Sequence, residues 1–215
     1  CLVGAFQSAV RLLVEGLSFS NDIPRGGGIP FYLFASHWQA GLLREASRHL
    51  LPRSNQPEVL RTLISSLQRL ERVRPRVTEA LAAECVVQTY TYEHELGHAS
   101  LPKAVRYWVV PKGSQPSREY CAEVIAFHLN PTATVQRLQD AYREAIERSR
   151  LPTYRPAKYG WPGPANLGSQ TCGLSPDYFV RHDFCILVDM RAVTLMTALR
   201  LYQLEHRRYP PSLEA

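Results

Sequence analysis

The sequence contains no apolar run that approaches the roughly 20 residues needed for a membrane-spanning helix. Hydrophobic residues nevertheless make up 45% of its 215 residues, which is enough for one large domain or two small ones with a buried core. The chain begins at Cys1 without Met and stops at Ala215 inside a patterned stretch. We therefore expect a piece of a longer protein, soluble over this length, in which a signal peptide or membrane anchor would lie upstream of Cys1.

The sequence also lacks C-x-x-C motifs and the common nucleophile motifs. No two cysteines form C-x-x-C, which argues against a structural zinc knuckle, and neither G-x-S-x-G nor a catalytic-cysteine pattern is present. The five cysteines are Cys1, Cys85, Cys121, Cys172 and Cys185. Their odd number and wide spacing leave two alternatives open: one or two disulfides in an exported protein, or buried free thiols, since Cys85 and Cys185 have apolar neighbours.

Lysine is scarce, and nearly all of the positive charge is arginine. The net charge is +6, from 25 Lys and Arg against 19 Asp and Glu. The arginines on expected helices are Arg61, Arg69, Arg72, Arg74, Arg76, Arg137, Arg143, Arg148 and Arg150. Arginine binds phosphate well, but no Lys-rich tail, recognition-helix pattern or aromatic-basic module accompanies these residues. The pattern favours solvated helix faces, and binding of nucleic acid or another anionic polymer is the third hypothesis.

Helical periodicity accounts for most of the first 51 residues. Over residues 1–19, apolar residues recur at helical spacing, namely at Leu2, Phe6, Val10, Leu13 and Leu17. The segment NDIPRGGGIP at 21–30 then predicts a flexible loop. Its three glycines lack both a preceding strand and the G-x-x-x-x-G-K-S/T pattern of a phosphate-binding loop. A second helix is expected over 31–51, ending near Pro52.

Two further helices are predicted before residue 102. Asn55 is the expected N-cap of a third helix that has Pro57 in its first turn, and Pro75 opens a fourth that ends by Pro102. The inward face of the third helix comprises Val59, Leu60, Leu63, Ile64, Leu67 and Leu70. That of the fourth comprises Val77, Leu81, Cys85, Tyr92 and Leu96.

The second half predicts more helices and one strand. VRYWVV is the expected strand, 118–129 is a short helix, and the helix after Asn130 has Pro131 near its start and Pro152 beyond its end. A Pro-, Gly- and aromatic-rich stretch precedes a final helix at about 183–206, with Asp183 near its N-cap. Its inward face is Leu187, Met190, Thr194, Leu201 and Leu204.

These elements predict an all-α fold, an irregular bundle of about seven helices with an irregular loop before the last long helix. The expected segmentation is a helical domain at 1–151, an irregular connection at 152–182 and a C-terminal helix with the start of a truncated segment at 183–215, together forming one domain.

The sharpest chemical motif is H-E-L-G-H at residues 94–98. His94 and His98 are four residues apart and therefore lie on one face of a helix, where their imidazoles can bind one Zn²⁺. Glu95 can act as general base on a zinc-bound water. Glu119 and Glu123 follow on the next expected helix. Their E-x-x-x-E spacing resembles the glutamate helix of gluzincin metallopeptidases, which implies Glu119 as third ligand and Glu123 as a hydrogen-bonding partner that orients His94. His128 is a spare ligand.

A chance origin of the motif competes with this interpretation. The spacing arises by chance in roughly one in a hundred chains of this size, and surface helices often carry mixed polar faces of this kind. The sequence also places no strand before the motif, where a zinc peptidase would pair with an extended substrate.

The C-terminal half carries another set of motifs. FHLNPTATVQRLQDAYREAIERSRLP is followed by a long helix and the ending Y-P-x-S-L, at Tyr209, Pro210, Ser212 and Leu213. Over 127–215, and more faintly over 56–88, the chain resembles a family of uncharacterised bacterial envelope proteins. Its ending is also similar, more weakly, to that of type II secretion pseudopilins. The H-E-L-G-H stretch lies between the recognisable blocks and departs from the family pattern.

The envelope resemblance implies a helical protein with an N-terminal membrane anchor and no known activity, cofactor or catalytic residue. We therefore expect a protein on the periplasmic side of a bacterial cell envelope, with a cytoplasmic location as the alternative. It would act without catalysis, through contacts with an unknown protein partner, and without a cofactor. The membrane would be reached only through an upstream anchor. The alternative function is a zinc-dependent metallopeptidase, with zinc as its cofactor.

Overall fold

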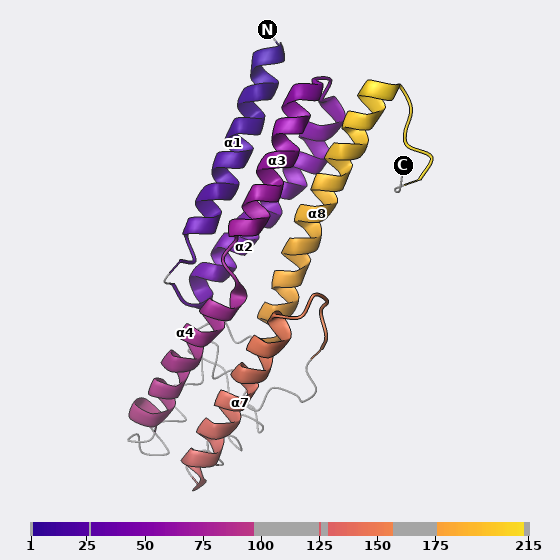
Figure 1. Cartoon of the computed structure of the whole chain (residues 1–215). Helices are drawn as coiled ribbons and strands as arrows, with labels where there is room; N and C mark the ends of the chain where they lie inside the picture. The colour runs from indigo at the N-terminus through magenta and orange to yellow at the C-terminus, as the bar shows by residue number, and fades with distance from the viewer. Residues whose placement is uncertain (1, 26, 97–124, 126–128, 157–175, 213–215) are drawn as a thin grey trace, which may run out of the picture. The chain divides into compact units, whose positions relative to one another are not determined.

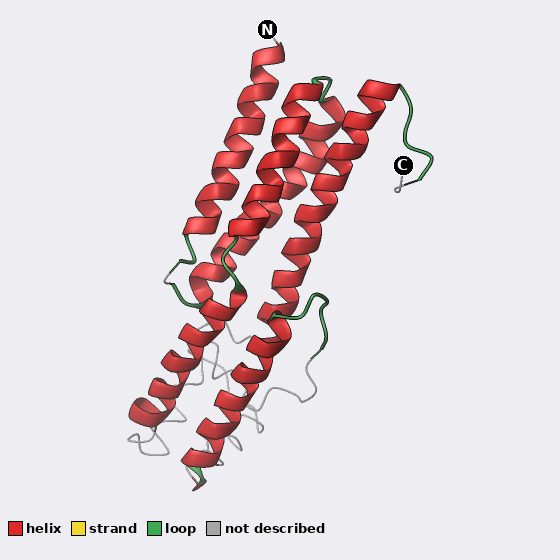
Figure 2. Ribbon diagram, viewed as in Figure 1, coloured by secondary structure: helices red, strands yellow, loops and turns green. Residues whose placement is uncertain are grey.

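The computed structural model describes residues 2–25, 27–96, 125, 129–156 and 176–212 (Figure 1). Within that part of the chain every regular element is a helix (Figure 2), which confirms the all-α class. The count of about seven helices is not confirmed. The expected strand VRYWVV and most of the expected helix at 118–129 lie outside the described residues.

The chain divides into two compact units. Unit 1 comprises residues 1–25, 33–75 and 184–215, and unit 2 comprises residues 26–32 and 76–183. The division falls inside α2 (Ile29–Glu45) and α8 (Pro176–His206), so each of these helices contributes residues to both units. None of the described helices combines the length and the apolar content needed to cross a membrane.

Unit 1 is built from α1 (Leu2–Asp22), the later part of α2, α3 (Pro57–Val73) and the later part of α8. Its core contains the predicted inward leucines of α3 together with residues of the other three helices. The buried members include Val10, Leu13, Leu17, Leu43, Leu60, Leu63, Leu67, Leu70, Met190 and Val193. Burying each such side chain stabilises the fold by about 1.5–3 kcal/mol, so this one cluster supplies the main cohesion of unit 1.

The start of α3 corrects one prediction. Gln56, and not Asn55, is the N-cap, and its side chain makes no capping hydrogen bond. Pro57 occupies the first helical position, and the residue before a proline is driven into the extended region, which ends helical geometry there. Proline therefore sets this boundary instead of a capping side chain.

Polar contacts hold α8 antiparallel to α3 in unit 1. Near the C-terminal end of α3, Arg191 Nε and Nη2 lie 2.9 and 2.8 Å from Glu71 Oε1. Near its N-terminal end, Arg61 contacts Glu205. Between the helices α2 and α3, the carbonyl oxygen of Ser54 accepts hydrogen bonds from Arg200 Nε and Nη2 at 3.1 and 2.9 Å. Residues of α8 thus form polar contacts with both α3 and the segment that precedes it.

The second predicted helix ends less regularly than expected. After Glu45 the chain continues as a π-helical segment, η1 (Ala46–Leu50), and then as a 3-10 turn, η2 (Leu51–Arg53). The termination near Pro52 is confirmed. The loop predicted at 21–30 is shorter than expected, because α1 runs on to Asp22 and α2 begins at Ile29.

Unit 2 contains α4 (Val77–Tyr90), its π-helical continuation η3 (Thr91–Leu96), α7 (Pro131–Ser149) and the first residues of α2 and α8. The predicted start of α7 is confirmed, because the Asn130 side chain accepts a hydrogen bond from Ala133 N at 3.1 Å and Pro131 follows it. The deeply buried side chains of unit 2 include Ile29, Val77, Leu81, Tyr92, Leu138, Tyr142, Phe179 and Val180.

The final helix begins earlier than predicted. It starts at Pro176 instead of near 183, so residues 176–182 do not belong to the expected irregular connection. Proline and an acidic residue favour the first turn of a helix, and Pro176 and Asp177 supply both. Asp183 is consequently not an N-cap: it lies inside α8 and accepts a hydrogen bond from the Tyr32 hydroxyl.

Candidate functional site

The H-E-L-G-H segment lies at the edge of the described residues. The structure places His94 in η3, directly after α4. The backbone of Glu95 belongs to the same segment, whereas its side chain and the whole of His98, Glu119, Glu123 and His128 lie outside the described residues. The convergence of these groups on one zinc ion therefore stays a prediction.

His94 is exposed, and its ring lies against the preceding turn. The ring stacks on that of Tyr90, with centroids 4.2 Å apart and planes inclined by 13°. Its Nδ1 lies 3.2 Å from the carbonyl oxygen of Tyr90. A carbonyl can only accept a hydrogen bond, so the tautomer that satisfies this contact carries its proton on Nδ1, and its Nε2 is the nitrogen that a metal would bind.

The same contact also occurs away from the motif. Nδ1 of His37 lies 2.8 Å from the carbonyl oxygen of Leu33, one turn earlier in α2. A helical histidine thus adopts this geometry without any metal motif around it. Among the residues that the structure describes, no three His, Cys, Asp or Glu side chains are grouped so that they could hold a metal ion.

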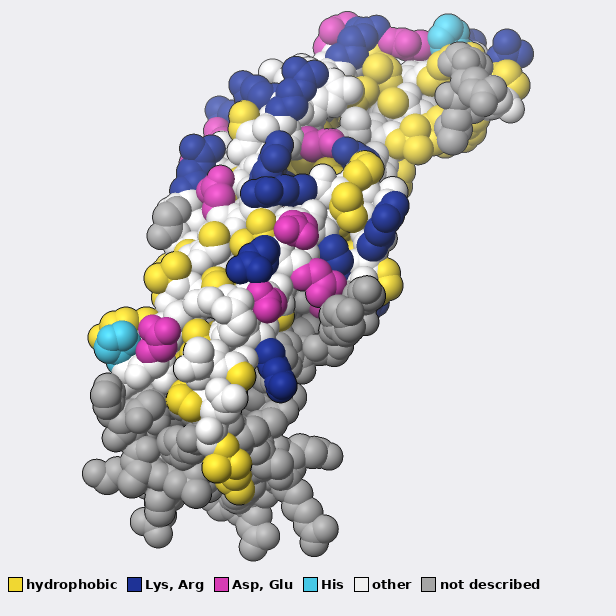
Figure 3. Space-filling view, turned by 60° about the horizontal axis from the view of Figure 1, so that its bottom comes forward, with side chains coloured by type: hydrophobic (Ala, Val, Ile, Leu, Met, Phe, Trp, Pro, Cys, Tyr) yellow, Lys and Arg dark blue, Asp and Glu magenta, His cyan; other side chains and the backbone are white. Residues whose placement is uncertain are grey.

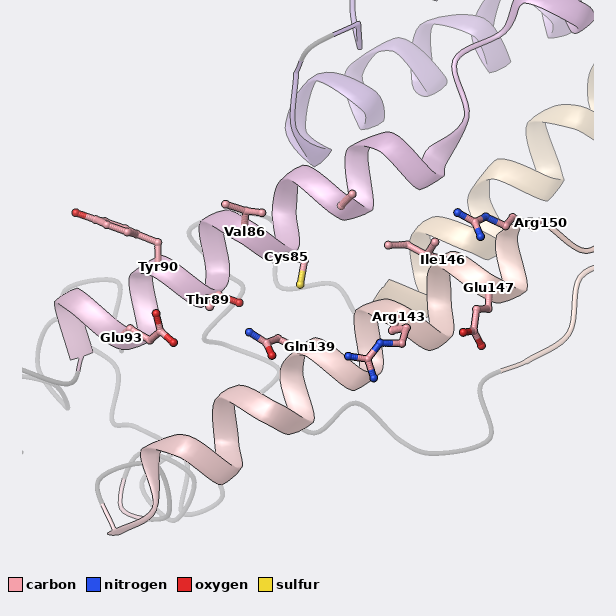
Figure 4. Close-up of a pocket in the computed structure, with 11 residues that line it drawn as sticks. Cys85, Val86, Thr89, Tyr90, Glu93, Gln139, Arg143, Ile146, Glu147 and Arg150 are labelled. Atoms are coloured by element: carbon pink, nitrogen blue, oxygen red, sulfur yellow. The ribbon is translucent and has the colours of Figure 1, made fainter.

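A hollow of about 710 Å³ lies between α4 and α7 in unit 2. Figure 4 shows Cys85 pointing from α4 toward Gln139 and Arg143 of α7. Burial raises the pKa of the Cys85 thiol, although the positive charge of Arg143 acts in the opposite direction. A raised pKa disfavours the thiolate, which is the nucleophilic form of a cysteine. Cys85 is half-buried and Cys185 is exposed, and both are free thiols.

An exposed apolar region of unit 1 lies along α1 and α2. The two helices approach closely at Gly16, where a Cβ would lie only 3.0 Å from Leu42 Cδ1 and 3.9 Å from Trp38 Nε1. Four large apolar side chains near this contact are exposed: Leu12 and Phe19 on α1 and Phe34 and Trp38 on α2. We call these four residues, with the groove described next, the α1–α2 surface.

A groove continues the α1–α2 surface toward η1 and η2. It has a volume of about 820 Å³, and its walls are formed mainly by Ala5, Phe6, Ala9, Leu12, Leu42 and Leu50. Glu45, His49 and Arg53 also line it and supply its polar groups. Phe34 and Trp38 stack beside each other with ring centroids 6.4 Å apart. An apolar groove with polar residues and exposed aromatic side chains is typical of a protein-binding site.

The α1–α2 surface is not among the features predicted from the sequence. The one apolar stripe predicted for the helix at 1–19 contains the buried residues Val10, Leu13 and Leu17. The same helix carries a second stripe, which also repeats at intervals of three or four: Ala5, Ala9, Leu12, Gly16 and Phe19. Two apolar stripes on one short helix are the signal that could have indicated an exposed apolar face.

Several of the predicted helix-face arginines are held by carboxylates. Arg143 Nη1 lies 2.7 Å from Asp140 Oδ1, and Arg61 contacts both Glu58 and Glu205, which together raise the pKa of its guanidinium. On the face shown in Figure 3, the Arg side chains that are drawn in blue lie among Asp and Glu side chains. That view therefore shows no single basic patch of the kind that binds nucleic acid.

Comparison of the chain with protein-family models, with curated proteins and with solved structures gives no match. The resemblances to envelope proteins, to pseudopilins and to gluzincins therefore stay predictions from the sequence. The α1–α2 surface and the environment of His94 are the structural features that bear on function.

Proposed function

We propose that this chain is a helical, non-catalytic module that binds a partner protein through the α1–α2 surface, on the periplasmic side of a bacterial envelope. The observation that carries the proposal is the exposure of Leu12, Phe19, Phe34 and Trp38 on two adjoining helices. Keeping such side chains in water is unfavourable, and covering them with a partner would release that cost.

The chemistry of the surface fits a protein partner with an apolar helix or loop. Trp38 and Phe34 are large, have few rotatable bonds and lose little conformational entropy when they are covered, which is why aromatic residues dominate binding energy at interfaces. Leu42 and Trp38 lie so close to α1 at Gly16 that an added Cβ would be 3.0 and 3.9 Å from them, so the two helices are packed together at this surface before a partner binds. A preformed site binds more tightly because less ordering accompanies association. The envelope location rests on the sequence resemblance over 127–215.

Replacing Trp38 by Ala is expected to weaken binding of the partner by about 10- to 1,000-fold, the range for a central aromatic residue of an interface. The test immobilises the wild-type chain and its variants, exposes them to a bacterial envelope extract and quantifies the retained proteins by mass spectrometry. A matched control is Tyr209→Ala, because Tyr209 is exposed to a similar extent in unit 1 but lies outside the α1–α2 surface.

Under the proposal, the wild-type chain and the Tyr209→Ala variant retain the same protein and the Trp38→Ala variant loses it. Equal retention by all three chains, or retention of no protein by the wild type, would rule out this surface as the binding site. Circular dichroism of each variant establishes that the helices are intact.

The second candidate function is a zinc-dependent metallopeptidase with His94, His98 and Glu119 as ligands and Glu95 as base. One structural observation favours it: Nδ1 of His94 lies 3.2 Å from the Tyr90 carbonyl oxygen, a contact that in metal-binding histidines orients the ring so that Nε2 binds the metal. His37 makes the same contact with the Leu33 carbonyl although no metal motif surrounds it, so the contact alone does not identify a zinc ligand. Zinc binding is therefore the property that separates the two functions.

The zinc function predicts about one Zn²⁺ per chain, because its single site needs three protein ligands and one water. The protein, purified without a histidine tag and dialysed against trace zinc, is analysed for metal by mass spectrometry. His94→Ala should lose the zinc, whereas His37→Ala, which removes a ring with the same backbone contact, should keep it. A zinc-free wild-type chain, or zinc retained by the His94→Ala variant, contradicts the metallopeptidase.

A further inference from the structure

A second exposed apolar stripe runs along α8 in unit 1. It repeats at alternating intervals of three and four residues and consists of Cys185, Val188, Ala192, Leu195, Leu199 and Tyr202. We call these residues the α8 seam. The first four are exposed, Leu195 to 45%, and the last two are half-buried. Alternation of three and four is the spacing by which one helix packs along another in a coiled coil.

The α8 seam is separate from the face that α8 buries in its own chain. That face includes Ile186, Met190, Val193 and Thr197, all with little or no exposure. Successive residues are about 100° apart around a helix, so the two stripes lie on different sides of α8. A helix that is apolar on two sides normally has both of them covered, and the described part of unit 1 covers one.

A second copy of α8 fits the seam when the two helices run antiparallel. If Leu195 faces Leu199 of the second copy, Ala192 faces Tyr202 of that copy, and the symmetric pairs follow. The smallest seam residue then lies opposite the largest, which is the alternation of sizes that fills a helix interface without voids. The overlap would run from Val188 to His206, and all of it belongs to unit 1.

The charged residues beside the α8 seam also favour the antiparallel arrangement. In the antiparallel register, Arg191 beside the seam faces Glu205 of the second copy. Each already contacts an opposite charge in its own chain, Arg191 with Glu71 and Glu205 with Arg61, so association would join them into a row of alternating charges. In a parallel register, Arg191 would instead face Met196 and gain no opposite charge. Flanking charges of this kind set orientation in coiled coils.

We propose that the chain forms an antiparallel homodimer through the α8 seam. The overlap is about three heptads, near the lower limit for a coiled coil. The seam is distinct from the α1–α2 surface, so a dimer would carry two copies of that surface, one on each chain. The proposal therefore goes beyond the proposed function and does not depend on it.

Leu195→Glu tests the seam. Because Leu195 faces Leu199 in two symmetric layers, one substitution places two charges in the interface, and we expect the dissociation constant of the dimer to rise by about 100-fold or more. Analytical ultracentrifugation of the full chain over a range of concentrations measures it. The matched control is Leu12→Glu, the same change at an exposed leucine of unit 1 on the α1–α2 surface, which should leave the dimer intact.

The two variants also separate this inference from the proposed function. Leu195→Glu should abolish the dimer and keep partner binding, whereas Leu12→Glu should do the reverse. A wild-type chain that stays monomeric at high concentration, or a dimer that Leu195→Glu does not weaken, overturns the α8 seam as an interface. Thermal unfolding of both variants verifies that each is folded.

Cross-linking tests the direction of the helices. In the antiparallel register, Met196 lies near Met196 of the second copy, so a Met196→Cys variant should be joined to itself by a short bis-maleimide. The two Cys185 residues would be separated by about 36 Å along the axis and should not be joined. In a parallel dimer the two Cys185 residues would be neighbours. Peptide mapping that finds a Cys185–Cys185 link and no link at position 196 overturns the antiparallel arrangement.

Discussion

Replacing Leu63 by Ala should lower the free energy of unfolding of unit 1 by about 3 kcal/mol, within the range measured when a buried leucine is truncated. Leu63 has no exposed surface, and it lies in the middle of α3 within the cluster that joins α1, α2, α3 and α8. Its neighbours in the cluster come from several packed helices, and packed helices shift only partly toward a cavity. The loss of dispersion contacts then adds to the loss of hydrophobic burial.

Urea unfolding followed by circular dichroism measures this change. Ser65→Ala is the control on the same helix: Ser65 is exposed, and its hydroxyl donates a hydrogen bond to the Thr62 carbonyl of the preceding turn. It should alter the free energy of unfolding by no more than about 0.5 kcal/mol. A loss below about 1 kcal/mol for Leu63→Ala would mean that the site is open to water or able to repack.

Replacing Arg148 by Met should destabilise unit 2 by about 3 kcal/mol, at the lower end of the range for breaking a buried ion pair. Arg148 is only 9% exposed. Its Nη1 contacts the carboxylate of Asp177 in the first turn of α8 and also donates to the carbonyl oxygen of Arg155 at 2.9 Å. Methionine fills a similar volume but supplies no hydrogen bond, so it would leave a carboxylate and a carbonyl without this partner.

The size of this effect depends on what remains around Asp177. The Asp177 carboxylate would still accept a hydrogen bond from the Tyr154 hydroxyl at 2.9 Å, and its side chain is 27% exposed to water. Both features lessen the loss, so we expect a value at the lower end of the range for a buried ion pair. Hydrogen exchange should show the loss as faster exchange at the start of α8. Arg150→Met, an exposed arginine just beyond α7, should leave that exchange unchanged. Equal effects of the two variants would refute the role of the Arg148–Asp177 pair.

The parts of the fold that the sequence predicted are those governed by local rules. The buried leucines of α3 follow from helical periodicity, and the start of α7 follows from the preference of proline for the first turn of a helix. The start of α8 was missed because the Pro-, Gly- and aromatic-rich composition ahead of the last helix predicts an irregular connection at 152–182, although Pro176 and Asp177 are favourable in a first turn.

The candidate sites also differ in whether local sequence or long-range packing defines them. H-E-L-G-H was found because its members are adjacent in the sequence, but whether Glu119 lies near His94 depends on long-range packing that no spacing rule supplies. The α1–α2 surface required knowing which of two apolar stripes faces the core. Both stripes of α1 have helical spacing, and only the positions of α3 and α8 decide between them.

The discontinuous course of unit 1 has a consequence for how the protein is made. Helices α1 and α3 are translated before residues 76–183, and the α8 residues Met190, Val193 and Arg200 come only afterwards. At about 5–20 residues per second, the nascent chain would present the leucines of α3 without α8 for roughly 5–20 s. Over the same interval the Ser54 carbonyl oxygen would lack the hydrogen bonds that Arg200 donates to it. Slowing translation before residue 184 should therefore lengthen the interval in which chaperones bind the α3 leucines.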